Sequence, residues 1–287
     1  MTDAIARARP RLGRLVTSLE HFASVGSTND VALERIRSAN LFHLRSPETR
    51  ASDGGPTEAP AARRAGEREQ RSVGLVIVAD EQTAGRGRRG HTWFSPPGAG
   101  LYVSVVLAPA TACVDPARAT LLTTLCAGVA LVEGVERAAG LRADLKWPND
   151  LHVSRRKLAG ILAEGAGEAV VVGYGINVST AALPPEVRDR ATSLEAELGR
   201  SVDRTVVLVE TLVALSQRYE DLLAGRFDAI LDAWRAHAPR ASGARVQWNQ
   251  SGETLSGMTA GVDDHGALLV RVGDRIERIV SGEVTWL

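Results

Sequence analysis

Residues 79–107 read ADEQTAGRGRRGHTWFSPPGAGLYVSVVL, and this stretch decides the class of fold. A strand pattern, VGLVIVAD at 73–80, leads into it, and a second, GLYVSVVL at 100–107, ends it. Between them, three glycines and three arginines fall within residues 85–90. Two prolines and two glycines then follow, so a helix cannot begin after the loop. The stretch predicts two strands joined by a glycine-hinged cationic loop.

The glycine spacing of this loop suggests two nucleotide-binding motifs, and neither fits. Gly85, Gly87 and Gly90 match GxGxxG, but the dinucleotide-binding form needs a helix that begins inside the motif. The loop also approaches the P-loop pattern, but His91 stands where that motif requires lysine. A solvated surface turn is one alternative. The other is a loop that closes over an anion, since guanidinium groups suit phosphate or carboxylate oxygens.

Composition limits the class of protein. With 287 residues, 44% of them hydrophobic, the chain can form one large globular domain and a small one. The formal net charge of zero gives no reason to expect whole-molecule attraction to nucleic acid or to anionic membranes. Two cysteines, Cys113 and Cys126, are too few for a disulfide scaffold or a metal site. Because the N-terminus lacks the apolar stretch of a secretory signal, we expect a cytoplasmic protein.

The N-terminal third contains a predicted helix and a predicted insertion. GSTNDVALERIRSANLF at 26–42 is typical of a helix with Ser27 at the N-cap and Asp30 three residues later. Residues 46–72 contain no Val, Ile, Leu, Met, Phe, Trp or Tyr. Such a segment buries too little apolar surface to offset its ordering entropy, so we expect a disordered surface insertion.

The middle of the chain predicts a long helix followed by antiparallel strands. Asp115 and Pro116 are typical of a helix start, and the apolar pattern continues to about Ala139. Strand-like segments then follow in close succession, which favours antiparallel pairing. They read ADLKWPND, LHVS, KLAGILAEG and AVVVGYGINV.

The C-terminal part predicts two more helices and a small β domain. Asp203 caps an amphipathic pattern that runs to about Leu223, and FDAILDAWRAHA is a further helix. From Gly243 onward, short alternating strands surround the turns DDHG and VGDR. This pattern of short strands and tight turns predicts a small β barrel or sandwich of about 45 residues.

Lysine is almost absent from the chain, and its two copies lie close together. Of 34 Lys and Arg residues, only Lys146 and Lys157 are lysines. Lys146 and Asp150 flank a Trp-Pro turn, and Lys157 begins an apolar strand. Chance clustering and a solvated residue at a strand entrance are the ordinary explanations. The alternative is a site that needs a compact ammonium charge, which a planar guanidinium cannot replace.

Five short motifs, taken in order, resemble those of biotin protein ligases. They are GSTND, EQTAGRGRRG, KWPND, RKLAGIL and GYGINV. Three of the five asparagines, Asn29, Asn149 and Asn177, lie within them. The resemblance covers nearly the whole chain apart from the extreme N-terminus and the insertion.

This resemblance implies an α+β fold. Its catalytic domain would be a mixed sheet with flanking helices, similar to class II tRNA synthetases and the biotinyl-lipoyl ligases, at residues 1–240. A small SH3-like β barrel would follow at 241–287. Only 26 residues precede Ser27, fewer than the ~50 of a small domain, so we expect no N-terminal DNA-binding domain and no specific DNA binding.

The implied reaction has two steps. Biotin and MgATP give biotinyl-5'-AMP and pyrophosphate, and a lysine of a biotin carboxyl carrier domain then attacks the mixed anhydride. The carrier would belong to acetyl-CoA carboxylase or a related carboxylase. The oligomeric state, including a homodimer, stays open.

The resemblance also assigns site residues. For biotin it implies Ser27, Thr28, Asn29, Gln82, Gly85, Arg86, Arg88, Trp93, Lys157, Gly173 and Gly175. For ATP and the adenylate it implies Arg88, Arg89, Lys146, Asn149, Lys157 and Asn177. Those assigned to catalysis are Lys157, Arg86, Arg88 and Asp150, with no metal held by the protein.

Some features depart from the family pattern or leave alternatives. His91 stands where a further cation is expected, and the segment after Asn177 identifies no adenine-stacking residue. Asp150 can equally be a turn-capping residue. A lipoate or octanoate ligase is the alternative enzyme, although such enzymes generally lack Lys-Trp-Pro-Asn-Asp. A noncatalytic nucleic-acid module is disfavoured by the zero net charge.

Overall fold

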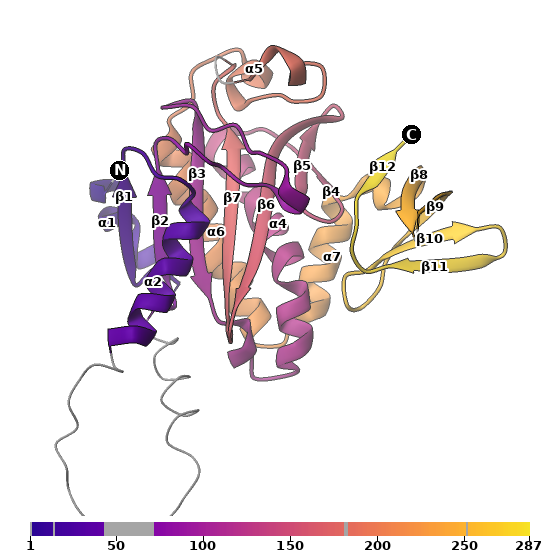
Figure 1. Cartoon of the computed structure of the whole chain (residues 1–287), viewed down its shortest axis with the longest axis horizontal. Helices are drawn as coiled ribbons and strands as arrows, with labels where there is room; N and C mark the ends of the chain where they lie inside the picture. Colours follow the sequence, from indigo (N-terminus) through magenta and orange to yellow (C-terminus); the bar gives the residue numbers. More distant parts are fainter. Residues whose placement is uncertain (1, 14, 43–71, 181–182, 251) are drawn as a thin grey trace, which may run out of the picture.

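The chain forms a seven-stranded mixed sheet covered by helices, next to a five-stranded antiparallel sheet (Figure 1). The structure is a computed structural model that describes residues 2–13, 15–42, 72–180, 183–250 and 252–287. The large sheet has the order β1-β2-β3-β7-β6-β5-β4. Its strands are β1 (Ser18–Phe22), β2 (Leu75–Ala79), β3 (Gly100–Leu107), β4 (Asp144–Lys146), β5 (Asp150–Val153), β6 (Arg156–Ala166) and β7 (Ala169–Asn177).

Helices cover both faces of this sheet. α2 (Thr28–Phe42) covers one face, and α4 (Pro116–Ala139) and α6 (Arg204–Leu223) cover the other. The remaining α-helices of the described residues are α1 (Thr2–Ala8), α5 (Leu194–Leu198) and α7 (Phe227–His237). The pleat directs alternate side chains of β2 to opposite faces. Ile77 packs with residues of α2, whereas Val76 and Val78 pack with residues of α4 and α6. Because both faces are covered, β2 and β3 are buried along their whole length.

The predicted helix boundaries of α4 and α6 are confirmed. The Asp115 side chain accepts a hydrogen bond from the Arg118 N–H, and α4 then runs to Ala139, where Gly140 follows with φ 72°. The Asp203 side chain accepts from the Thr205 N–H at the start of α6. By length and composition, α4 is also the one helix in the described ranges that could cross a membrane, but most of its apolar stretch is buried inside the molecule.

The antiparallel pairing predicted for the strand-rich middle is confirmed, and the sheet extends further than predicted. β4, β5, β6 and β7 pair successively in antiparallel fashion, and β3 joins them through β7. β1 was not predicted as a strand, and it pairs with β2 in parallel. The helices α1 and α5 were also not predicted. Residues 46–71 of the predicted insertion lie outside the described residues, and Ser72, which was included in it, is buried.

The C-terminal sheet is all antiparallel and has the order β11-β10-β9-β8-β12. Its strands are β8 (Ser242–Gln250), β9 (Glu253–Val262), β10 (Leu268–Val272), β11 (Arg275–Ile279) and β12 (Val284–Trp286). The predicted turns DDHG and VGDR join β9 to β10 and β10 to β11. The division of the chain at residue 240 and the SH3-like barrel stay predictions.

The turn between β9 and β10 contacts helix α4 and the Trp-Pro turn that follows β4. Trp147 Nε1 donates to the Gly266 carbonyl at 2.9 Å, and Arg118 Nε donates to the Asp264 carbonyl at 2.8 Å. Trp147 is itself buried and lies between the two lysine-bearing strands in sequence. The C-terminal sheet is thereby held beside the Trp-Pro turn.

Candidate active site

A pocket of about 250 Å³ brings the five sequence motifs together. All of the predicted site residues line it except Gly85 and Asn177. Residues that were not predicted also line it, namely Gly87, His91, Thr92, Trp147, Pro148, Gly160, Ile161, Leu162, Tyr174, Gly282, Glu283 and Val284. Gly282 and Glu283 come from the segment that leads into β12, a strand that the sequence did not predict, and Val284 is the first residue of that strand.

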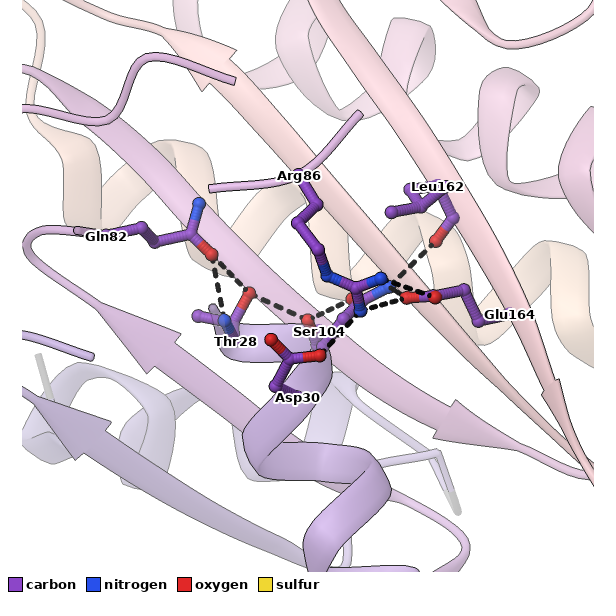
Figure 2. A network of polar contacts seen from close by, with 8 residues as sticks. Thr28, Asp30, Gln82, Arg86, Ser104, Leu162 and Glu164 are labelled. Atoms are coloured by element: carbon purple, nitrogen blue, oxygen red, sulfur yellow. Dashed lines mark hydrogen bonds and ion pairs between the residues drawn. The ribbon is translucent and has the colours of Figure 1, made fainter. Parts of the chain in front are cut away.

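One end of the pocket is a chain of hydrogen bonds among buried polar side chains (Figure 2). Gln82 Oε1 accepts from the Thr28 N–H at 2.8 Å and from Thr28 Oγ1 at 3.1 Å. Gln82 Nε2 donates to Ser95 Oγ at 2.9 Å. Ser104 Oγ lies 2.8 Å from Thr28 Oγ1 and 2.6 Å from Asn29 Oδ1. Since buried polar groups need partners, this network holds the first turn of α2 against β3. Sequence reasoning did not single out Ser104.

Arg86 belongs to the same region, and its charge is already paired (Figure 2). Its Nη1 and Nη2 donate to the two carboxylate oxygens of Glu164 at 2.9 and 2.7 Å, and Nη2 also donates to Asp30 Oδ1 at 2.7 Å. Burial lowers the pKa of Arg86, but the hydrogen bonds and charges of Glu164 and Asp30 outweigh it and raise the pKa. The guanidinium therefore fastens the glycine-arginine loop to α2 and β6. Its predicted contact with an anion stays a prediction.

Arg88 and Lys146 are cations placed in a partly dry environment. Arg88 Nη1 donates to Asn149 Oδ1 at 3.3 Å, and Asn149 Nδ2 is held by the Ile161 carbonyl at 2.7 Å. Burial lowers the pKa of Arg88, and the nearby charge of Arg89 adds to this effect. Burial is also the main cause that lowers the pKa of Lys146. An anion entering the pocket would offset these costs.

Lys157 lines the pocket next to Asp150 and Trp93. Its Nζ is 2.7 Å from Asp150 Oδ1 and 5.5 Å from the centre of a Trp93 ring. Burial raises the pKa of Asp150, but the interaction with His152 and the charge of Lys157 outweigh it, so the pKa is lowered. The carboxylate is therefore ionised at neutral pH. Of the predicted catalytic residues, Lys157 and Asp150 are in direct contact.

The predicted glycines make room for protein side chains. A Cβ atom on Gly175 would lie 2.4 Å from Trp93 Nε1, and one on Gly173 would lie 2.1 Å from Asn29 Oδ1. A Cβ atom on Gly160 would lie 3.1 Å from Trp93 Cζ3. Trp93 thus lies directly against β6 and β7. These glycines therefore admit the side chains that line the pocket, and the predicted biotin contact of Gly173 and Gly175 stays a prediction.

Gly85 and Asn177 lie behind the pocket wall. A Cβ atom on Gly85 would be 2.3 Å from the Trp93 carbonyl oxygen, so glycine lets the two ends of the loop meet. Asn177 Nδ2 donates to the Thr192 carbonyl at 3.0 Å and to the Lys157 carbonyl at 3.4 Å. Asn177 therefore fixes the backbone next to Lys157. Its predicted adenylate contact stays a prediction.

Sequence reasoning also missed residues that act on the site from other parts of the chain. They are Glu164, Ser104, His152 and Glu283. The one sequence signal that could have linked His152 to Asp150 is their spacing of two residues, because alternate side chains of a strand lie on the same face. In the part of the chain that the structure describes, His, Cys, Asp and Glu side chains form no group of three or more that could hold a metal ion.

Comparison with known proteins agrees with this arrangement. Residues 64–180 match the family model described as "Biotin/lipoate A/B protein ligase family", and residues 241–285 match "Biotin protein ligase C terminal domain". The bifunctional ligase/repressor BirA of Bacillus subtilis is 37% identical over 218 residues, which make up 74% of this chain and 66% of that protein. The biotin--[acetyl-CoA-carboxylase] ligase of Mycobacterium tuberculosis is 35% identical over 219 residues, 75% of this chain and 79% of that protein.

Solved structures are similar along nearly the whole chain. The biotin protein ligase from Aquifex aeolicus in complex with biotin and ATP has a TM-score of 0.71 and 26% identity, covering 94% of this chain and 99% of that one. The mixed sheet and its cation-lined pocket thus define a catalytic domain of the biotin and lipoate protein ligase class. Within that class, the chain belongs to the biotin protein ligase family.

Proposed function

We propose that the protein activates biotin with ATP to form biotinyl-5'-AMP and then transfers biotin to a lysine of a carboxylase carrier domain. The observation that carries this proposal is the convergence of Lys157 and Arg88 on one pocket that also offers an aromatic wall, Trp93. A ligand with an apolar body and an activated carboxyl group needs both features. The ligase names of the relatives and the biotin and ATP bound by the Aquifex protein support it.

The polar end of the pocket suits the ureido group of biotin. A ureido group carries a carbonyl acceptor and two N–H donors, and burying it requires a partner for each. Ser27, Thr28 and Gln82 line this end and offer hydroxyl and amide groups. We expect the Thr28–Gln82 hydrogen bonds to rearrange around the ureido group. Trp93 would then cover the apolar ring and chain of the ligand.

Activation joins two anions, and the cations of the pocket offset their repulsion. A biotin carboxylate oxygen attacks the α-phosphorus of ATP, and the bond from that phosphorus to the bridging oxygen of pyrophosphate breaks. Lys157 would exchange its contact with Asp150 for the carboxylate and α-phosphate oxygens, where negative charge builds up. Loss of one such donor typically costs on the order of 10²–10³-fold in rate. Arg88, Arg89 and Lys146 would bind the remaining phosphate oxygens.

Magnesium would enter as part of the MgATP substrate. Mg²⁺ takes oxygen ligands and is commonly held by substrate phosphates with one or two carboxylates. The carboxylates that line the pocket are Asp150 and Glu283, and Asp150 is in contact with Lys157. The phosphates would therefore supply most of the ligands.

Transfer requires an uncharged amine from the carrier lysine. Asp150 is ionised and lies beside Lys157, at the place where the acyl-adenylate would form. It is a suitable base for the incoming ammonium group. Because an acyl-adenylate reacts with water, the loop held by Arg86 would also protect the intermediate until the carrier arrives.

The relatives support biotin as the substrate and a carboxylase as the source of the partner. A lipoate or octanoate ligase is not favoured, because the similar ligases whose names state a substrate are biotin ligases. The partner would be a biotin carboxyl carrier domain. We further propose that the protein works in the cytoplasm and does not bind specific DNA.

Mass spectrometry of a carrier domain tests this proposal. The domain would be incubated with the protein, MgATP and either biotin or lipoate, and with each component left out in turn. We expect a mass gain of one biotinyl group that needs ATP, and no lipoyl adduct. An unmodified carrier together with no biotin-dependent exchange of pyrophosphate into ATP would refute the proposal.

A further inference from the structure

The carboxylate of Asp150 lies between an amine and an imidazole. Its Oδ1 is 2.7 Å from Lys157 Nζ, and its Oδ2 is 3.8 Å from His152 Nε2. Asp150 and His152 are two residues apart on β5, so their side chains point to the same side of the strand. An imidazole, unlike an uncharged amide, can accept a proton near neutral pH.

The other ring nitrogen of His152 fixes where a proton can be accepted. Nδ1 lies 3.2 Å from the carbonyl oxygen of Arg155, and a carbonyl oxygen can only accept a hydrogen bond. The hydrogen of the neutral ring is therefore on Nδ1, and the lone pair is on Nε2. Only the protonated ring donates from Nε2 toward Asp150, and in that form it lowers the pKa of the carboxyl group. Nε2 is buried and has no hydrogen-bond partner among the described residues. It is thus a vacant proton acceptor that faces Asp150.

A second cavity, of about 290 Å³, lies on the far side of this pair. His152 lines the second cavity but not the first, and Asp150 lines the first but not the second. Lys146, Glu283 and Val284 line both, so they form the partition. The contact of Asp150 with His152 therefore connects the substrate pocket with a separate cavity that is open to solvent.

We infer that His152 is a positioning residue that takes up, through Asp150, the proton lost by the carrier lysine. This inference rests on the proposed function. The lysine ammonium gives a proton to Asp150, which passes it to His152 Nε2, and the imidazolium releases it into the second cavity. The amine nitrogen then bonds to the acyl carbon of biotinyl-5'-AMP. The amine loses a second proton to water, the bond from that carbon to the phosphate oxygen breaks, and AMP leaves with the electron pair.

Charged side chains surround His152 on its own strand β5, on the paired strands β4 and β6, and across the second cavity. On the strands, Asp144 of β4 and Lys157 of β6 are its pairing partners, and Asp150 is its neighbour along β5. Across the second cavity, the charged residues are Lys146, Arg155, Arg240 and Glu283. Four of these groups are cations (Lys146, Arg155, Lys157 and Arg240) and three are carboxylates (Asp144, Asp150 and Glu283), so charges of both signs surround His152.

The test separates the two half-reactions in the full-length protein. Biotin-dependent exchange of labelled pyrophosphate into ATP reports adenylate formation. Single-turnover transfer from enzyme-bound biotinyl-5'-AMP to a carrier domain reports the second step, across about pH 5.5–8.5, the range where histidine titrates. The variants are His152→Asn, whose amide can still donate to the Arg155 carbonyl, and His152→Gln. His21→Gln is the matched control, since His21 Nε2 lies 3.1 Å from Asp80 Oδ2 outside both cavities.

We expect both His152 variants to keep near-normal exchange and to lose about 10-fold or more in transfer, the lower end of what positioned proton-transfer groups contribute. The rise of the transfer rate with pH should flatten, and imidazole added to a His152→Ala variant should restore part of it. Transfer at the wild-type rate with an unchanged pH profile in both variants would overturn the inference. Absence of exchange in the wild-type protein would instead refute the proposed function.

Discussion

Arg86 and Glu164 lie 78 residues apart in the sequence and form a two-pronged ion pair, with Nη1–Oε1 and Nη2–Oε2 distances of 2.9 and 2.7 Å. Asp30, from the start of α2, contacts the same guanidinium. Three separate segments of the chain are thus joined at one charged group. The loop that was predicted to close over an anion is anchored at its first arginine by the protein itself.

Glu164→Gln should loosen this anchor. We expect faster hydrolysis of the bound adenylate and a higher KM for biotin, because the loop would shield the pocket less well. Arg86 is partly exposed, so the loss of folding stability should stay within about 1 kcal/mol. The release of biotin and AMP from preformed adenylate measures the effect. The control is Glu20→Gln, because Glu20 accepts from Arg35 through both carboxylate oxygens away from the pocket, and this change should leave the rate unchanged.

Lys157→Arg should retain the fold and lose most of the adenylation activity. A guanidinium is broader than an ammonium group, and the space beside Asp150 and Gly160 is tight, since a Cβ atom on Gly160 would lie 3.3 Å from Lys157 Nζ. We expect a fall on the order of 10²-fold in pyrophosphate exchange. The control is the reverse substitution at the neighbouring position, Arg156→Lys. Arg156 is paired with Glu197 outside the pocket. Comparable exchange rates for these two variants would contradict the central role of Lys157.

Gly175→Ala should displace Trp93. The new methyl group would lie 2.4 Å from Trp93 Nε1, closer than real contacts allow, and the ring must move. We expect weaker biotin binding by calorimetry and an altered indole fluorescence signal. Gly165→Ala on β6 is the matched control, because its Cβ would meet no atom within 4 Å. Equal biotin affinity in both variants would show that the Trp93 position is not needed.

Asp150 should make stability depend on pH in the acid range. Its pKa in the folded protein is below the ordinary 3.8, because the interaction with His152 and the charge of Lys157 outweigh the opposing effect of burial. A depressed pKa stabilises the folded state above the unfolded pKa, and this contribution is lost as the pH falls through the folded-state pKa. The difference in unfolding free energy between wild type and Asp150→Asn should therefore be constant near neutral pH. Under strongly acidic conditions this difference should fall, because protonation of Asp150 removes the contribution of its charge.

Urea denaturation at a series of pH values measures this difference. Asp274→Asn, on the exposed turn between β10 and β11, controls for the loss of a carboxylate at the surface. A pH-independent difference for Asp150→Asn would show that its charge is not stabilised by Lys157 and His152.

Local patterns predicted the elements that have strong local signals. The Asp115 and Asp203 caps, the apolar runs of β2 and β3, and the turns of the C-terminal sheet all follow from neighbouring residues. β1 was missed because SLEHF has only a weak alternation, and its strand conformation depends on parallel pairing with β2. β12 was missed because three residues carry no period, and pairing with β8 creates the strand.

The amino-acid sequence by itself determined the family, the order of the motifs and just over half of the residues that line the pocket, because these are properties of residue type and spacing. The tertiary structure alone decided which of those residues are paired. Arg86 forms an ion pair with Glu164, the absence of a Cβ at Gly175 admits Trp93, and Asp150 lies between Lys157 and His152. These relationships depend on distances of a few ångströms between segments that are distant in the chain, and on the burial that strengthens charge interactions there. The order of residues along the chain specifies neither these distances nor this burial.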